Sequence, residues 1–169
     1  MATFRTPDLT LESMKALLSG RRYAILGTVN RDSSIHLTPV WYLFRDGLLF
    51  VTSVLASRKV KNIIANPQVS LLVDVRKPVE EKWVCASGTA KIIKGEESKK
   101  INTEVFKRYV TPAGLEEPKV APLLHPLHDV TIRITPNAWR SLDAKPLYQQ
   151  LFPGIPTATV EQWFLPLDL

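Results

Sequence analysis

The chain has 169 residues, is 45% hydrophobic and carries 22 basic against 16 acidic side chains, a formal net charge of +6. This length and apolar content allow one sizeable core and favour a single folded unit. No apolar run reaches the roughly 20 residues needed to span a bilayer, and the N-terminus lacks the apolar stretch of a signal peptide. We therefore expect a soluble, cytoplasmic protein without a membrane partner. The single cysteine, Cys85, excludes an internal disulfide and a cysteine-based metal site.

The positive charge suits an anionic partner such as nucleic acid, a membrane surface or a phosphorylated cofactor. The basic residues are spread along the chain, however, and no nucleic-acid-binding motif accompanies them. A focused phosphate site explains this pattern more economically, so we expect no nucleic-acid partner.

The first half of the chain predicts a short helix followed by three strands. Residues 10–19 have apolar residues at helical spacing behind a Thr10 N-cap. Three segments rich in β-branched and aromatic residues then predict strands at 23–29, 35–44 and 48–53. Asp46-Gly47 between the last two favours a tight hairpin, since both residues tolerate positive φ. These two strands should be antiparallel neighbours.

The second half alternates helices and strands. The pattern predicts helices at 57–66 and 96–110 and strands at 69–75, 82–93 and 129–135. Gly88 inside the second of these strands indicates a bulge or a close backbone approach. Repeated prolines predict a loop with isolated turns over 112–128. The tail beyond Leu142 is rich in proline and aromatic residues, and it is too apolar to be simply disordered.

Six antiparallel strands with short flanking helices predict a closed or nearly closed β-barrel of the α+β class. We expect residues 1–142 to form this barrel and residues 143–169 to form an extension that packs on the barrel or on a partner subunit. The sequence has neither GxGxxG nor GxxxxGK[ST], which argues against a nicotinamide-binding Rossmann fold and a P-loop.

Three consecutive residues at the start of the second helix form a candidate phosphate site. Amides at a helix N-terminus attract anions, Arg58 can bind two oxygens at once, and Lys59 supplies a point charge. The preceding Ser57 adds a hydroxyl. The alternative interpretation is that Ser57 is only an N-cap and that the two cations merely solvate the helix.

The segments HLTPVWYLFRDGLLFVTS, ASRKVKNIIANPQVSLLVD and WVCASGTAKI carry a family resemblance over residues 10 to about 142. This part of the chain resembles the flavin-binding split-barrel superfamily, which includes pyridoxamine 5′-phosphate oxidase. The resemblance rests on the order of a hairpin, a basic helix start, an Asn-Pro helix stop and a following apolar strand. The resemblance implies a six-stranded antiparallel split barrel that binds FMN noncovalently as a homodimer and acts as an oxidoreductase on a small-molecule substrate that the sequence does not identify.

The resemblance also implies which residues approach the cofactor. The first strand of the hairpin would contact the isoalloxazine edge, mostly through its backbone, at Thr38, Pro39, Val40 and Trp41. The end of the next strand would contact the ribityl chain and phosphate at Val51, Thr52 and Ser53. The phosphate cluster would be Ser57, Arg58 and Lys59. Residues from the second subunit would be Trp83, Trp139 and Arg140, although core packing is the commoner role of a tryptophan.

The sequence leaves the catalytic residues unassigned. The arginine-leucine-histidine-x-arginine signature with which pyridoxamine phosphate oxidases hold their substrate phosphate is missing, because residues 139–148 read WRSLDAKPLY. We expect no metal, since no histidine has ligand spacing with another ligand type. Two alternatives stay open: a deazaflavin-dependent reductase, whose cofactor has a longer acidic tail, and a non-catalytic flavin- or haem-binding protein.

Overall fold

The computed structural model describes residues 8–165, apart from the side chain of His128. Its α+β fold is built on one antiparallel sheet with the strand order β2-β1-β5-β6-β7-β4-β3. The strands are β1 (Ala24–Val29), β2 (Ile35–Val40), β3 (Tyr42–Arg45), β4 (Leu48–Ser53), β5 (Gln68–Val75), β6 (Lys82–Lys94) and β7 (Val130–Asp143). The helices are α1 (Leu11–Ser19), α2 (Arg58–Ala65), α3 (Gly95–Tyr109), α4 (Pro112–Glu116), α5 (Ala121–Leu124), the 3₁₀-helix η1 (His125–His128), α6 (Ala144–Leu151) and α7 (Thr157–Glu161).

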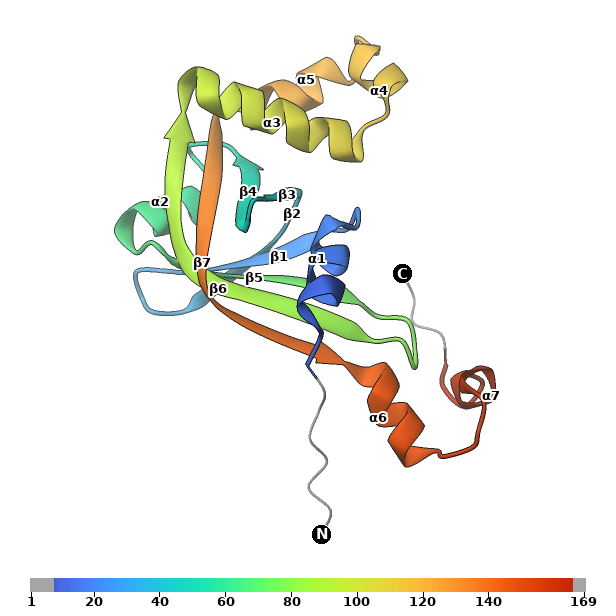
Figure 1. Cartoon of the computed structure of the whole chain (residues 1–169). Coiled ribbons are helices and arrows are strands. Elements are labelled where there is room, and N and C mark those ends of the chain that lie inside the picture. The colour runs from blue at the N-terminus through green and yellow to red at the C-terminus, as the bar shows by residue number, and fades with distance from the viewer. Residues whose placement is uncertain (1–7, 166–169) are drawn as a thin grey trace.

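The sheet coils strongly, with α3, α4 and α5 at one end and α6 and α7 at the other (Figure 1). Its long strands β6 and β7 run from end to end and pair along their length. None of the helices that the structure describes is both long and apolar enough to cross a bilayer.

The two edge strands of the sheet are consecutive in the chain. Strands β2 and β3 lie at opposite edges, yet only Trp41 separates them. The prediction of one continuous strand over 35–44 was therefore wrong: the chain leaves one edge at Val40 and joins the other at Tyr42. This break raises the number of strands from six to seven, and the hydrogen-bonded sheet is open between β2 and β3 instead of closed.

The predicted hairpin and the predicted irregularity at Gly88 are both confirmed. Asp46 and Gly47 have φ of 53° and 76°, and β3 pairs with β4 across this turn. The β6–β7 ladder shifts register between Ser87 and Gly88. At the shift, Gly88 pairs with Pro136, which has no N–H for the ladder. This is why β7 passes through Pro136 and reaches Asp143 instead of ending at residue 135.

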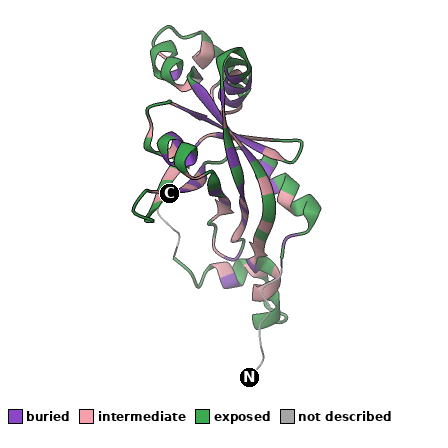
Figure 2. Cartoon of the chain, turned by 90° about the vertical axis from the view of Figure 1, so that its left-hand side faces the viewer, coloured by how far each residue is buried: buried purple, intermediate pink, exposed green. Residues whose placement is uncertain are grey.

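The core fills the interior of the coiled sheet, as the purple strand segments in Figure 2 show. Alternate residues of the strands and the apolar side of α1 and α2 meet there, including Leu18, Leu26, Leu71, Val60 and Ile132, all at most 1% exposed. Tyr42 is also fully buried, and its hydroxyl donates to the Leu18 carbonyl at 2.8 Å. Burial raises the pKa of this phenol to about 12, so it stays a neutral donor.

Residues 112–128 form three short helical segments, where the sequence predicted a loop with isolated turns. Pro112, Pro122 and Pro126 each lie in the first turn of a segment. A proline there costs no hydrogen bond and fixes a helical φ, so these prolines begin helices where we expected them to prevent any.

The tail after β7 folds into α6 and α7, beside the turn between β5 and β6. Lys77 pairs with Glu161 at 3.4 Å, and the Tyr148 hydroxyl donates to Glu81 at 3.4 Å. The ring of Tyr148 packs against Phe152 and Phe164. The described tail thus contacts its own chain, while the division into a barrel (1–142) and an extension (143–169) stays a prediction.

Replacing Gly88 by alanine should destabilise the fold by about 2–3 kcal/mol, because overpacking against a rigid backbone is costly. A Cβ at this position would lie 2.2 Å from the Thr135 carbonyl oxygen and 2.8 Å from Pro136 Cα. Gly27→Ala is the control, since its Cβ would meet only ordinary contacts of 3.4 and 3.5 Å. Urea unfolding of both variants measures the difference. Equal stabilities would show that β6 and β7 separate at the bulge without cost.

Candidate functional site

The loop between β4 and α2 brings two hydroxyl groups together at the start of α2. The Ser57 hydroxyl caps the helix by accepting from Val60 N–H at 3.4 Å, and the Ser53 hydroxyl lies 3.1 Å from it. The Ser57 N–H bonds back to the Val54 carbonyl at 3.0 Å, which closes the loop into a tight turn. Ser57 is thus an N-cap, as the alternative interpretation held, and this role leaves the rest of the first turn open.

The first turn of α2 concentrates positive charge that no described salt bridge neutralises. The N–H groups of Arg58 and Lys59 have no intrahelical acceptor, as at any helix start, and no acidic residue lies in this turn. Within residues 8–165, neither side chain forms a salt bridge. Arg58 is exposed, whereas Lys59 is half-buried, and burial lowers the pKa of its ammonium group. An anion placed here would offset the cost of desolvating Lys59.

The helix is held against the sheet by a buried amide. Asn62 is 4% exposed, and its side-chain N–H₂ donates to Thr28 Oγ1 at 3.1 Å and to Asn30 Oδ1 at 2.9 Å. These bonds fix α2 relative to the end of β1. They also fix Asn30 at the start of the turn between β1 and β2.

That turn, β2 and α2 enclose a recess of about 390 Å³. Its lining residues are Asn30, Arg31, Asp32, His36 and Arg58. The carboxylate of Asp32 accepts from the Ser34 hydroxyl at 2.6 Å and from Ser34 N–H at 3.0 Å, and these bonds lower its pKa. The one acidic group is therefore already engaged, while two arginines and a histidine face the recess.

The recess lies beside two of the predicted cofactor segments. Arg58 lines it, and so does His36, whose Nε2 is 2.8 Å from Thr38 Oγ1 on one face of β2. Sequence reasoning gave no role to His36 or to Arg31. The two-residue spacing of His36 and Thr38 on a strand could have placed them together.

Unpaired backbone edges flank the opening between β2 and β3. Strand β2 pairs only with β1 and is an edge strand, which confirms the position predicted for Pro39. On the other side, pairing of β4 with β3 stops at Val51, so Thr52 and Ser53 pair only with β7. The backbone of Thr38–Val40 and of residues 52–53 therefore has no strand partner on one side. Val51 is fully buried, and Thr52 and Ser53 are 6% and 1% exposed.

The three residues expected to act from the second subunit lie on two faces of the sheet. Cys85 is opposite Arg140, and Trp83 is two residues away along β6, so Trp83 and Arg140 share the outer face. Trp139 lies opposite Ala86 on the inner face and packs against the core and Phe44. The structure brings together Trp83 and Arg140 but not Trp139.

The outer face also carries an apolar groove of about 390 Å³ across β2, β1, β5 and β6. Ile35 and Leu37 at its rim are 63% and 64% exposed. Ile25, Leu72 and Cys85 continue the groove. Single exposed apolar residues are common, but a contiguous set on one sheet face indicates an interaction surface.

Among the described residues, no group of three or more histidine, cysteine or acidic side chains could hold a metal ion. The chemistry available at the site is therefore hydrogen bonding from backbone edges and hydroxyl groups, with cationic attraction from α2 and the recess. This combination suits a flat polar ring joined to an anionic group.

Several solved structures have a similar fold. A structure of a conserved hypothetical protein from Mycobacterium tuberculosis is 24% identical, with a TM-score of 0.71 and coverage of 88% of this chain and 91% of the other. One described as an F420 reductase is 23% identical, with a TM-score of 0.62 over 77% and 98% of the two chains. An FAD-binding protein from Mesorhizobium loti is 20% identical, with a TM-score of 0.60 over 82% and 97%.

These likenesses show the fold, and no curated protein matches the sequence. The family itself is shown by its sequence model, described as pyridoxamine 5′-phosphate oxidase, which matches residues 10–143. That match spans the sheet, α2 with its cationic first turn, and the unpaired edges beside it. The chain belongs to the pyridoxamine 5′-phosphate oxidase family.

Proposed function

We propose that the protein is an FMN-dependent oxidoreductase of the split-barrel type. The observation that carries this proposal is the first turn of α2, where Arg58 and half-buried Lys59, neither of them in a described salt bridge, adjoin two hydroxyl groups and two strand edges. A phosphate at this turn would place the attached ring along the edges. FMN has one phosphate and one flat ring with hydrogen-bonding groups on its rim.

The residues of this chain would bind and orient the cofactor. The amides of Arg58 and Lys59 and the Ser53 hydroxyl would donate to phosphate oxygens, and the Arg58 guanidinium would add two parallel donors. The backbone of Thr38–Val40 would contact the polar rim of the ring. The bound FMN would supply the redox chemistry, while the protein supplies orientation and electrostatics.

Changing Arg58 and Lys59 together to alanine should weaken FMN binding by roughly a hundredfold or more, since hydrogen bonds to charged groups contribute about 1.5–3 kcal/mol each. Riboflavin, which lacks the phosphate, should bind with nearly unchanged affinity. Fluorescence titration of both ligands measures the two effects. Lys61→Ala is the matched control, because Lys61 is an exposed lysine one turn further along α2.

Equal losses for FMN and riboflavin would place the phosphate elsewhere. Failure of the wild-type protein to bind either ligand would overturn the proposal.

The recess supports a second candidate, a deazaflavin cofactor with a longer anionic tail. Arg31 and His36 line the recess together with Arg58, and so could meet charges that a single phosphate at the first turn of α2 does not reach. One structure of similar fold is described as an F420 reductase. The two candidates share the fold and the phosphate site and differ in what fills the recess.

Arg31→Ala distinguishes them. It should lower affinity for a deazaflavin with an acidic tail by about tenfold, the loss of one charge-assisted contact, and leave FMN affinity unchanged. Titration of the variant with each cofactor measures this, and Arg76→Ala serves as the control because Arg76 is an exposed arginine at the end of β5, outside the recess. If the Arg31→Ala protein keeps full affinity for both cofactors, Arg31 contacts neither of them.

The apolar groove supports a homodimer, with a second copy of the chain as its occupant. The groove lies on the face that carries Trp83 and Arg140, so a partner seated there would also cover both residues. Closed two-fold symmetry is the simplest arrangement of identical chains. Residues of one chain would then approach the cofactor of the other.

The wild-type protein should have twice the single-chain mass of 19.0 kDa in light scattering coupled to gel filtration. Leu37→Lys should shift it to the single-chain mass, because a charge would be buried in an apolar interface. Leu123→Lys is the control, since Leu123 is 72% exposed on α5, away from the groove. A wild-type protein of single-chain mass with FMN bound would show that one chain completes the site.

A further inference from the structure

The junction between β2 and β3 is held by the last turn of α3. The ring of Tyr109 lies parallel to the indole of Trp41, with centroids 5.0 Å apart and planes inclined by 2°. Phe106 meets the same indole edge-on at 6.4 Å. Two aromatic residues from a distant helix therefore set the orientation of the single residue that joins the two edge strands.

Tyr109 also binds the backbone beside Trp41. Its hydroxyl accepts from Tyr42 N–H at 3.2 Å and donates to the Arg22 carbonyl at 2.6 Å. The ring and the hydroxyl of one side chain thus hold both the side chain of residue 41 and the backbone of residue 42. Because residue 42 begins β3, this contact fixes where the chain joins the second edge.

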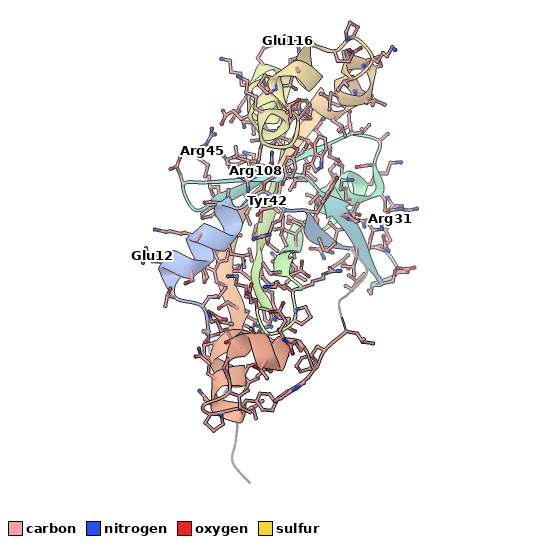
Figure 3. All side chains as sticks on the ribbon, turned by 90° about the vertical axis from the view of Figure 1, so that its right-hand side faces the viewer. Glu12, Arg31, Tyr42, Arg45, Arg108 and Glu116 are labelled. Atoms are coloured by element: carbon pink, nitrogen blue, oxygen red, sulfur yellow. The ribbon has the colours of Figure 1, made fainter. Side chains whose placement is uncertain are left out.

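Arg108, the neighbour of Tyr109, ties the same junction to α1. Its guanidinium lies over the Tyr42 ring at 5.2 Å and donates to the carbonyls of Leu18 and Gly20. These carbonyls belong to the C-terminal end of α1, where a cation is favoured. Figure 3 shows Arg108 and Tyr42 next to each other between the two helices.

We propose that Tyr109 is a positioning residue for the cofactor ring. It acts through Trp41 and the start of β3, and so sets the width and direction of the opening whose edges receive the ring. This inference rests on the proposed function, since it concerns the ring of the same cofactor. Tyr109 lies on α3 and is proposed to act through its neighbours. Its described contacts include Trp41, Tyr42, Arg22, Tyr23 and Arg108.

The test compares Tyr109→Leu, which removes the stack, with Tyr109→Phe, which keeps the stack and removes the hydroxyl. Tyr109→Leu should weaken FMN and riboflavin equally, by about tenfold each, because the ring and not the phosphate is misplaced. Tyr109→Phe should restore most of this affinity. Tyr148→Phe is the control, since it removes a tyrosine hydroxyl on α6.

The equal loss for two ligands separates positioning from the phosphate contact, which only FMN makes. It also separates positioning from a purely structural role. A purely structural role would lower the temperature of the unfolding midpoint and leave both affinities unchanged at temperatures well below that midpoint. If the wild-type protein binds flavin and Tyr109→Leu binds it with the same affinity, the inference is overturned and the proposed function stands. If Tyr109→Leu does not fold, Tyr109→Met removes the ring that stacks on Trp41 while filling its space with a flexible apolar side chain, and unchanged FMN and riboflavin affinity in Tyr109→Met overturns the inference. Absence of flavin binding by the wild-type protein would overturn the proposed function and the inference with it.

Discussion

Strands β2 and β3 lie at opposite edges of one sheet, yet a single residue, Trp41, joins them. The sheet must therefore coil until its edges meet at that residue, and away from it the edges diverge. Open edges present unpaired N–H and C=O groups, which usually need protection from other chains. Here the edges flank the first turn of α2, so the same constraint that coils the sheet also creates a place where a ligand can pair with backbone groups.

The opening has a half-buried lysine beside it. Some exposed basic side chains elsewhere are paired with acids, as Arg45 is with Glu104 at 2.6 Å and Lys99 with Glu96 at 2.8 Å. Such exposed pairs contribute little to stability, but they neutralise charge locally. Lys59 is half-buried and has no described acidic partner, which leaves its desolvation uncompensated within the chain. Local conflicts of this kind are expected where a ligand supplies the missing partner.

Local patterns predicted most of the elements because they depend on neighbouring residues. The N-cap role of Thr10, the turn at Asp46-Gly47 and the bulge at Gly88 follow from side-chain and backbone preferences that tertiary contacts did not override. The break at Trp41 was missed because a contact that holds it, the stack with Tyr109, comes from a residue 68 positions further along the chain. A β-rich run such as 35–44 contains no signal that the chain changes edges in its middle.

The candidate site likewise has one part that the sequence could predict and another that it could not. Ser57, Arg58 and Lys59 are contiguous, so a sequence pattern could indicate them together. The recess draws on the β1–β2 turn, β2 and α2, and long-range contacts that include the hydrogen bonds of Asn62 bring those elements together. His36 and Arg31 therefore gain a possible role only in the folded chain. The prolines of residues 112–128 are a different case. A proline disrupts a helix from the interior, but it favours the helix from the first turn, which is where the structure places three of them.

Under the proposed function, the cofactor ring and its anionic tail would be recognised by physically separate parts of the fold. Backbone edges offer the same donors and acceptors whatever side chains they carry, apart from a proline such as Pro39, and so they accept any flat ring with a similar polar rim. The anionic group meets side chains, and these can change without disturbing the sheet: Arg31 and Arg58 are exposed and belong to no described salt bridge. One family can thus keep its strands and its α2 start while altering the charge of the recess. Under the proposed function, the choice between FMN and a cofactor with a longer anionic tail would therefore depend on Arg31 and His36 more than on the sheet.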